Sequence, residues 1–116
     1  MAHIKVRFTQ RGKDSYKGLY LRFRKRSAKI ALELEAKTSE IKIRLSSPPS
    51  GPQNNPYHLE DAPCPTFIVR TYVRGDCIQF HYIVLPDYIA IYYVCSTFIP
   101  LDTDEYLKAL ISSKND

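Results

Sequence analysis

Cationic and aromatic residues fall on one face of a predicted β-sheet in the second half of the chain. Alternation along 66–95 places Arg70, Tyr72, Arg74, His81 and Tyr92 on the face opposite the apolar one. Aromatic rings stack on bases and guanidinium groups contact phosphates, which is how single-stranded nucleic acid is commonly bound. We therefore expect these five side chains to contact single-stranded RNA or DNA.

A dense cationic run, RFRKR, lies at 22–26. We expect Arg22, Arg24, Lys25 and Arg26 to add electrostatic attraction to phosphates, so that binding weakens steeply with salt. The alternative interpretation is a solvated loop without a partner.

The sequence shows no constellation typical of catalysis or of metal binding. No serine or cysteine nucleophile has an identifiable histidine base, and the three cysteines include no C-x-x-C pair. His58, Glu60 and Cys64 share residue types with the zinc deaminase pattern but lack its spacing and its second cysteine. We predict no enzymatic activity, no metal site and no cofactor.

Composition indicates one small intracellular domain. A chain of 116 residues has the length of a single domain, here 1–116. An odd number of cysteines favours a reducing compartment, which we take as cytoplasmic or nuclear. The N-terminus alternates polar and apolar residues rather than resembling a signal peptide, and the most apolar run, 88–95, is too short to span a bilayer.

The net charge of +5 is unevenly distributed, because residues 1–46 are strongly basic and 47–116 are net acidic. Such asymmetry indicates a polyanionic partner or head-to-tail self-association.

Alternation of apolar and polar residues predicts four strands in the basic half, at 4–8, 19–23, 30–36 and 41–45. The segment 28–45 is rich in helix formers, but its apolar residues recur every second position, and we give that period more weight. In the resulting meander, glutamates of the third strand face arginines and lysines of its neighbours and neutralise part of the basic charge.

A proline-rich segment at 46–65 predicts a flexible loop. After it, a Gly75-Asp76 turn predicts a hairpin with Val73 opposite Ile78 and Val69 opposite Tyr82. A further strand at 88–95 would place Ile89, Ile91, Tyr93 and Cys95 on the core face.

A helix is predicted at the C-terminus, with Asp102 as N-cap and Glu105 as its capping-box partner. The expected fold is therefore α+β and mostly antiparallel, with about seven strands and one helix. The strands form a four-stranded meander and a three-stranded one, arranged as a barrel or as two packed sheets.

Two resemblances follow from this element count and from the chain end. Seven strands and a C-terminal helix are similar to a pleckstrin-homology-like barrel, and Lys13, Lys17, Arg22 and Arg24 have the layout of its basic hairpin, which implies phosphoinositide binding. The passage from Ile99-Pro100-Leu101 into a capped helix resembles the end of the sheet-and-helix repeats of Whirly and Pur-type single-strand binders.

A protein-interaction role is the other alternative. Apolar Ile83, Leu85 and Val94 fall on the nominal outer face of the second sheet, and open sheet edges favour association. The alternative hypothesis is therefore an assembly module that acts as a homodimer.

Overall fold

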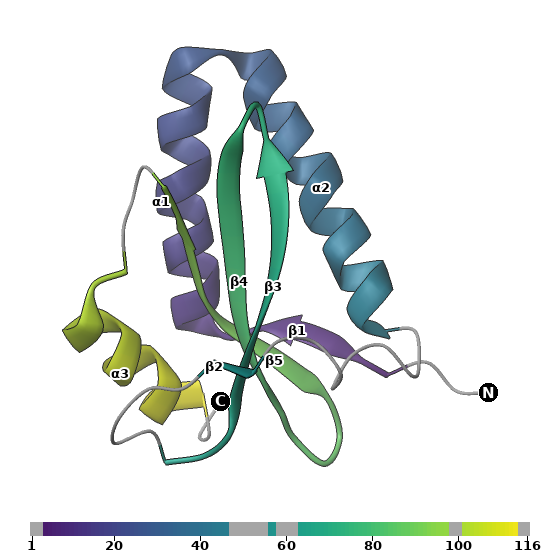
Figure 1. The fold of residues 1–116 in the computed structure, drawn as a ribbon, viewed down its shortest axis with the longest axis vertical. Helices are drawn as coiled ribbons and strands as arrows, with labels where there is room; N and C mark the ends of the chain where they lie inside the picture. The colour runs from purple at the N-terminus through teal and green to yellow at the C-terminus, as the bar shows by residue number, and fades with distance from the viewer. Residues whose placement is uncertain (1–3, 47–55, 58–62, 98–100, 114–116) are drawn as a thin grey trace.

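The computed structural model describes residues 4–46, 56–57, 63–97 and 101–113 (Figure 1). These residues form three helices and five strands, in the order β1 (Val6–Phe8), α1 (Gln10–Arg26), α2 (Ala28–Ser46), β2 (Pro56–Tyr57), β3 (Thr66–Val73), β4 (Asp76–Val84), β5 (Ile89–Ser96) and α3 (Thr103–Ser113).

The strands form one open, mixed sheet in the order β1-β5-β4-β3-β2, to which β2 contributes only two residues. β1 runs parallel to β5, and the other neighbours are antiparallel. The N-terminal strand therefore lies beside the last strand of the chain, at the edge opposite the β2 edge. The predicted barrel or pair of packed sheets is wrong, because the sheet is single and does not close.

The helices form a layer on each face of this sheet (Figure 1). α1 and α2 form a hairpin on one face, where Leu19, Phe23 and Leu34 pack with Phe80 and Ile91 in the main core. α3 covers part of the opposite face and encloses a smaller core.

The predicted strands at 19–23, 30–36 and 41–45 are wrong, because these residues lie in α1 and α2. The positions buried in α2 are three or four residues apart, which is the period of one helix face: Ala31, Leu34, Thr38, Ile41 and Leu45. The four-stranded meander, and the charge neutralisation across it, are therefore absent from the fold.

Exposed aliphatic residues explain the misleading alternation. Leu21, Leu32 and Ile43 are 46%, 61% and 66% exposed, so they belong to no core face. They fall between buried positions and complete a two-residue period in the sequence. Helix propensity, which favoured a helix at 28–45, was the better guide there.

Local capping fixes the ends of the two helices. The Thr9 Oγ1 accepts a hydrogen bond from the Gly12 N–H at 3.0 Å and caps α1. Ser27, in an extended conformation, ends α1 and accepts from the Lys29 N–H at the start of α2. One non-helical residue between two capped ends produces the tight hairpin.

The β3–β4 hairpin forms where it was predicted, but the predicted pairs Val73 with Ile78 and Val69 with Tyr82 are wrong, because the turn lies one residue earlier. Arg74 and Gly75 occupy the turn with φ of 53° and 86°, so the pairs are Val73 with Asp76 and Val69 with Phe80. Positive φ at both central residues is the geometry of a type I′ turn. Each β3 residue therefore pairs with a β4 residue two positions from the predicted one, so every side chain stays on its predicted face of the sheet.

A β-bulge changes the facing of β5 halfway along the strand. Tyr82 pairs with Ile91 but His81 pairs with Tyr93, so Tyr92 is an extra residue. Ile91 and Val94 therefore contact the main core, whereas Tyr93 and Cys95 contact the smaller core under α3. The predicted core-face placement of Tyr93 and Cys95 is wrong for this reason.

The C-terminal helix is as predicted, since the Asp102 side chain accepts a hydrogen bond from the Glu105 N–H at 3.1 Å. Of the predicted flexible loop 46–65, the structure describes residue 46, the two residues of β2 and residues 63–65. The rest of the loop lies outside the described residues. None of the described helices combines the length and the apolar character needed to cross a membrane.

Candidate nucleic-acid interface

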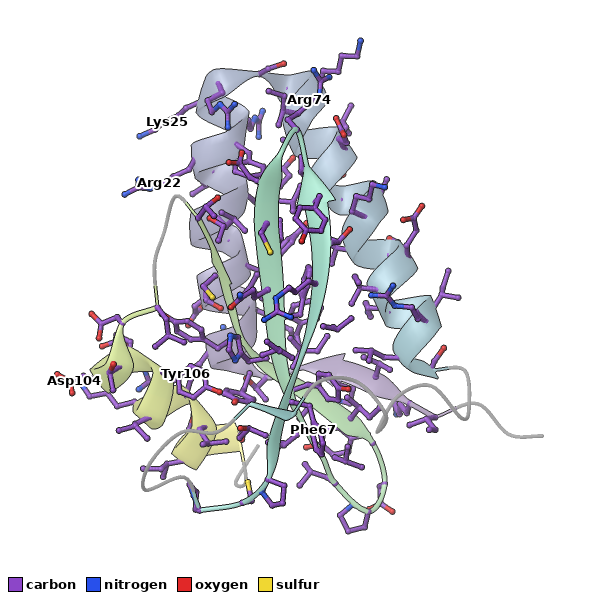
Figure 2. All side chains as sticks on the ribbon, in the orientation of Figure 1. Arg22, Lys25, Phe67, Arg74, Asp104 and Tyr106 are labelled. Carbon is purple, nitrogen blue, oxygen red and sulfur yellow. The ribbon has the colours of Figure 1, made fainter. Side chains whose placement is uncertain are left out.

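Basic residues gather where the α1–α2 hairpin meets the β3–β4 turn. We call this surface the basic end and define it as Arg22, Arg24, Lys25, Arg26, Lys29 and Arg74, all of which are exposed. Figure 2 shows Arg22 and Lys25 projecting from α1, and Arg74 at the same end of the molecule. Five of the nine residues predicted to contact nucleic acid are thus brought together at one end.

Two ion pairs attach the β3–β4 turn to the helices. The Arg26 guanidinium lies 3.3 Å from the Asp76 carboxylate, and the Arg74 guanidinium lies 2.8 Å from the Glu33 carboxylate. Together the two pairs join both helices to the turn. Because such surface ion pairs are screened by water, they add little to the free energy of unfolding. Their main effect is to hold Arg74 against the helical hairpin.

The other four cations have no such partner. No ion pair joins Arg22, Arg24, Lys25 or Lys29 to a carboxylate within the part of the chain that the structure describes. Part of this charge has a structural explanation, since cations in the last turn of α1 favour the helix dipole. That explanation does not cover Arg22 or Lys29, which lie outside the last turn.

A shallow hollow of about 340 Å³ lies on the basic end, between Arg22, Phe23, Lys25 and Arg26. The Arg26 guanidinium lies 5.7 Å from the centre of the Phe23 ring, within range of a cation–π interaction. This contact orients Arg26 alongside the hollow.

Arg70 and Tyr72 are exposed on the sheet face that α3 covers only in part. Tyr72 lies on β3, two residues before Arg74 of the turn, and it is 60% exposed. A tyrosine ring of this exposure has a free face on which a base can stack. The aromatic and cationic neighbours predicted from the sequence therefore persist at this end of the hairpin.

His81 and Tyr92 are placed differently from the prediction, because both are fully buried beneath α3. Their side chains join a hydrogen-bonded cluster with Tyr106 of α3. The Tyr92 and Tyr106 hydroxyls hydrogen-bond to each other, and the His81 Nδ1 lies 3.1 Å from the Tyr106 hydroxyl. Neither His81 nor Tyr92 can stack on a base in this structure.

Burial shifts the pKa values of this cluster. Desolvation, with a smaller effect from the Arg70 charge, lowers the pKa of His81 to about 3, so its imidazole is neutral. Desolvation, with a smaller effect from Cys77, raises the pKa of Cys95 to about 11. Desolvation and the adjacent Tyr106 raise the pKa of Tyr92. Burial thus favours the uncharged forms of His81, Tyr92 and Cys95, which suits a packing role.

Among the described residues, the cysteines belong to no group that could hold a metal ion. Cys64, Cys77 and Cys95 are free thiols, and among the described residues no three His, Cys, Asp or Glu side chains lie close enough together to hold a metal ion.

Comparison with known proteins finds no matching family model, no similar curated protein and no similar solved structure. The function must therefore be argued from the geometry of this chain.

Sequence reasoning missed the residues whose importance depends on the helices. Ser15 and Gly18 lie on one flank of α1 and face β5 and α3. Reading 10–26 as a helix would have found this flank, because Arg11, Ser15, Gly18 and Arg22 recur every three or four residues.

Proposed function

We propose that this protein is a non-catalytic module that binds single-stranded nucleic acid through its basic end. The observation that carries the proposal is a group of exposed cations, Arg22, Arg24, Lys25 and Lys29, that form no ion pair with a carboxylate of the described residues. Unpaired lysines and arginines attract phosphates and release condensed counterions on binding.

The position of Tyr72 supports a single-stranded ligand. Its ring is exposed two residues from Arg74, so a base could stack there while the flanking phosphates lie near Arg70 and Arg74. Stacking on an aromatic side chain requires an unstacked base and contributes about 1–3 kcal/mol per base. A duplex offers no such base, so Tyr72 favours single strands.

The fold removes the basis of the pleckstrin-homology-like interpretation. That resemblance needed seven strands and a closed barrel, whereas the sheet is open and most of the basic half is helical. The basic hairpin is an α-helical one, and its cations do not follow the layout of a β-hairpin.

Replacing three of the unpaired cations should weaken oligonucleotide binding about tenfold or more at low salt. The variant is Arg22→Gln, Arg24→Gln and Lys25→Gln, which removes charge without introducing repulsion at the end of α1. The affinity is measured by fluorescence anisotropy, with a labelled single-stranded oligonucleotide titrated at several salt concentrations. The slope of log affinity against log salt should become shallower by about 0.7 for each phosphate that the variant no longer neutralises.

The matched control is Lys5→Gln, Lys42→Gln and Lys108→Gln, which removes the same charge from exposed positions beside β1, on α2 and on α3. This control should retain the affinity of the unaltered protein within a factor of about two to three. Tyr72→Ala should weaken single-strand binding and leave duplex binding unchanged. Absence of binding at low salt, or equal losses of affinity in both triple variants, would contradict the proposal.

Self-association is the second candidate, and a different surface supports it. The patch expected at Ile83, Leu85 and Val94 is covered, since Ile83 and Val94 are buried and Leu85 is half-buried. The two most exposed large aliphatic residues of the described chain are instead Leu32 and Ile43, both on α2. Helices commonly pack through such positions.

Sedimentation analysis at micromolar concentration tests the second candidate. If α2 mediates a dimer, the unaltered protein should sediment as a dimer, and the double variant Leu32→Lys with Ile43→Lys should sediment as a monomer. A monomeric mass for the unaltered protein across this concentration range would exclude this form of assembly.

A further inference from the structure

A cleft lies between α1 and α2, on the side away from the tight turn that joins them. The two helices diverge with distance from Ser27, and β1 runs between the start of α1 and the end of α2 (Figure 1). The Ile4 N–H, just before β1, donates to the Ser46 carbonyl at 2.9 Å, and Thr9, just after it, caps α1. The cleft has a volume of about 470 Å³, within the range of about 300–1,000 Å³ that is typical of small-molecule sites.

Aromatic side chains form the apolar part of this cleft. Phe8 of β1 and Tyr16 of α1 line it, and both are half-buried. Their ring centres lie 5.8 Å apart in an edge-to-face arrangement. The Tyr16 ring also lies 6.3 Å from the ring of Tyr20, which helps to hold it in place. The cleft therefore offers aromatic surface against which a planar ring can pack.

Charged side chains surround the aromatic surface. Lys13 of α1 and both Glu35 and Lys42 of α2 line the cleft and are exposed. The Lys42 Nζ lies 5.8 Å from the centre of the Phe8 ring, so one positive charge is directly beside the aromatic surface. Among the described positions, no ion pair joins Lys13, Glu35 or Lys42 to a side chain of opposite charge. Two ammonium groups and one carboxylate are thus available to a ligand.

Hydroxyl groups add hydrogen-bonding capacity to the cleft. Ser39 is exposed on its α2 wall, whereas the neighbouring Thr38 is buried and donates to the Leu34 carbonyl at 2.8 Å. Burial, with a smaller contribution from the Glu35 charge, raises the pKa of Tyr16, so its phenol is protonated at neutral pH. The walls of the cleft can therefore both donate and accept hydrogen bonds.

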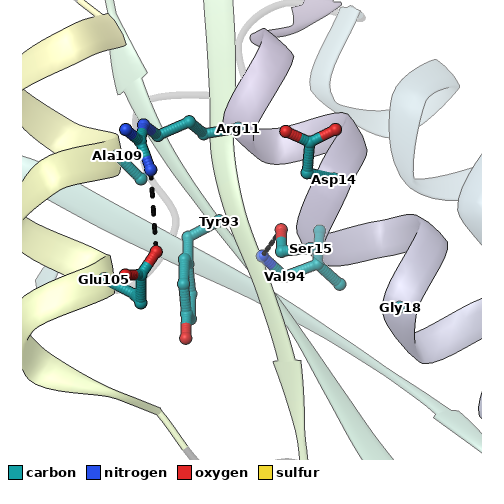
Figure 3. A pocket seen from close by; sticks show the side chains of 8 residues that line it. All are labelled: Arg11, Asp14, Ser15, Gly18, Tyr93, Val94, Glu105 and Ala109. Atoms are coloured by element: carbon teal, nitrogen blue, oxygen red, sulfur yellow. Dashed lines mark hydrogen bonds and ion pairs between the residues drawn. The ribbon is translucent and has the colours of Figure 1, made fainter.

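A second hollow, between α1 and α3, is lined by charged groups that already have partners (Figure 3). Arg11 and Glu105 form an ion pair across it at 3.6 Å. The Asp14 carboxylate accepts a hydrogen bond from the Gln10 side-chain amide at 3.1 Å. The charged groups of that hollow are thus engaged within the protein, which makes the cleft between α1 and α2 the better candidate for a ligand site.

We infer that the cleft between α1 and α2 binds a nucleoside monophosphate, a ligand that joins a planar ring to sugar hydroxyls and a phosphate. The base packs against Phe8 and Tyr16, as bases do on exposed aromatic side chains. The phosphate lies near Lys13 and Lys42, whose ammonium groups form charge-assisted hydrogen bonds with it. The Glu35 carboxylate accepts hydrogen bonds from the sugar hydroxyls.

This site is separate from the basic end. Lys13 and Arg24 lie near opposite ends of α1, roughly 16 Å apart along the helix axis. A nucleoside monophosphate in the cleft therefore contacts none of the cations that the proposed function uses. The inference does not depend on oligonucleotide binding at the basic end.

Amide-resolved NMR titration of the isotope-labelled protein tests the inference. The probes are adenosine monophosphate, adenosine, which lacks the phosphate, and ribose phosphate, which lacks the ring. Shifts caused by adenosine monophosphate should concentrate at Lys13, Tyr16 and Ser39. This probe should bind at least about tenfold more tightly than either of the others, because each of those lacks one of the two main contacts.

The charge variant is Lys13→Gln with Lys42→Gln. It should lower the affinity for adenosine monophosphate at least about tenfold, because the phosphate loses both ammonium groups. The matched control is Lys17→Gln with Lys108→Gln, which removes the same charge from exposed positions outside the cleft. This control should keep the affinity of the unaltered protein within a factor of about two to three.

Ser39→Leu is the variant that fills the cleft. Leucine is a better helix former than serine and the position is exposed, so the protein should fold. The larger side chain takes up space at the wall where the ligand lies, and the affinity for adenosine monophosphate should fall at least about tenfold. Ala36→Leu, at an exposed position of α2 outside the cleft, is the control and should leave that affinity unchanged.

The outcomes separate this inference from the proposed function. Lys13→Gln with Lys42→Gln should lose adenosine monophosphate and retain oligonucleotide binding, whereas the triple variant at the basic end should do the reverse. The inference is overturned if adenosine monophosphate causes no shifts or shifts only the basic end, or if adenosine or ribose phosphate binds as tightly. It is also overturned if Ser39→Leu or the lysine double variant binds adenosine monophosphate like the unaltered protein.

Discussion

Lowering the pH from 6.5 to 3 should reduce the free energy of unfolding by about 4 kcal/mol through His81 alone. The folded state holds the pKa of this histidine at about 3, mainly through burial, against an ordinary value of 6.5. The unfolded state therefore binds the proton more readily. The contribution is fully present above pH 6.5 and is lost as the pH falls toward 3.

Two uncharged groups lie beside the ring nitrogens of His81. Tyr106 and Cys95 lie at hydrogen-bonding distance from its two ring nitrogens, at 3.1 Å and 3.7 Å, and both are uncharged. Arg70 adds a repulsive effect on the protonated ring. Protonation thus places a cation between a buried tyrosine and a buried thiol.

Urea unfolding at a series of pH values measures this effect, with His81→Gln as the variant that cannot gain the proton. Carboxylates titrate in both proteins, so the difference between them isolates the histidine. The slope of stability against pH should be steeper in the unaltered protein by up to about 1.4 kcal/mol per pH unit. Parallel curves for the two proteins would show that His81 is protonated without cost.

Gly12→Ala should destabilise the protein by about 2–3 kcal/mol, although alanine is the better helix former. A Cβ at this position would lie well inside van der Waals contact with the carbonyl oxygen of Ile91, which is backbone and cannot rotate away. The Ile91 carbonyl also accepts a hydrogen bond from the Thr9 N–H at 3.0 Å. Relief of the clash must therefore move the start of α1 away from β5.

Gly18→Ala is the matched control for that substitution, since it adds the same atom to the same helix. A Cβ meets nothing at Gly18, so the change should stabilise the protein by up to about 1 kcal/mol. Thermal and urea unfolding of both variants measure the pair. Equal shifts of the same sign would show that helix propensity, rather than contact with β5, determines the effect at Gly12.

The sequence was sufficient to predict the hairpin of β3 and β4 and the capped α3, for reasons that are local. Alternation along 66–84 and a Gly at the turn fix two strands, and Asp102 fixes the start of a helix. The bulge at Tyr92 could not be predicted in this way, because its signal lies in the pairing with His81 and not in the strand itself.

The helical hairpin was missed because two local signals disagreed. Leu32 and Ile43 are apolar yet exposed, and they gave α2 the alternation of a strand. Only the tertiary contacts show that Leu34 and Ile41 are the core residues. The same misassignment hid Ser15 and Gly18, whose role depends on the flank of a helix that packs on β5.

The extra residue in β5 makes the docking of α3 separable from the rest of the fold. Without Tyr92, Ile89 to Cys95 would alternate regularly and every other side chain would keep its present side. Tyr92 therefore contributes nothing to the alternation of the strand and serves the contact with Tyr106. A substitution at Tyr92 can therefore change how tightly α3 packs on the sheet, while the strand order and the pairing of the sheet stay the same.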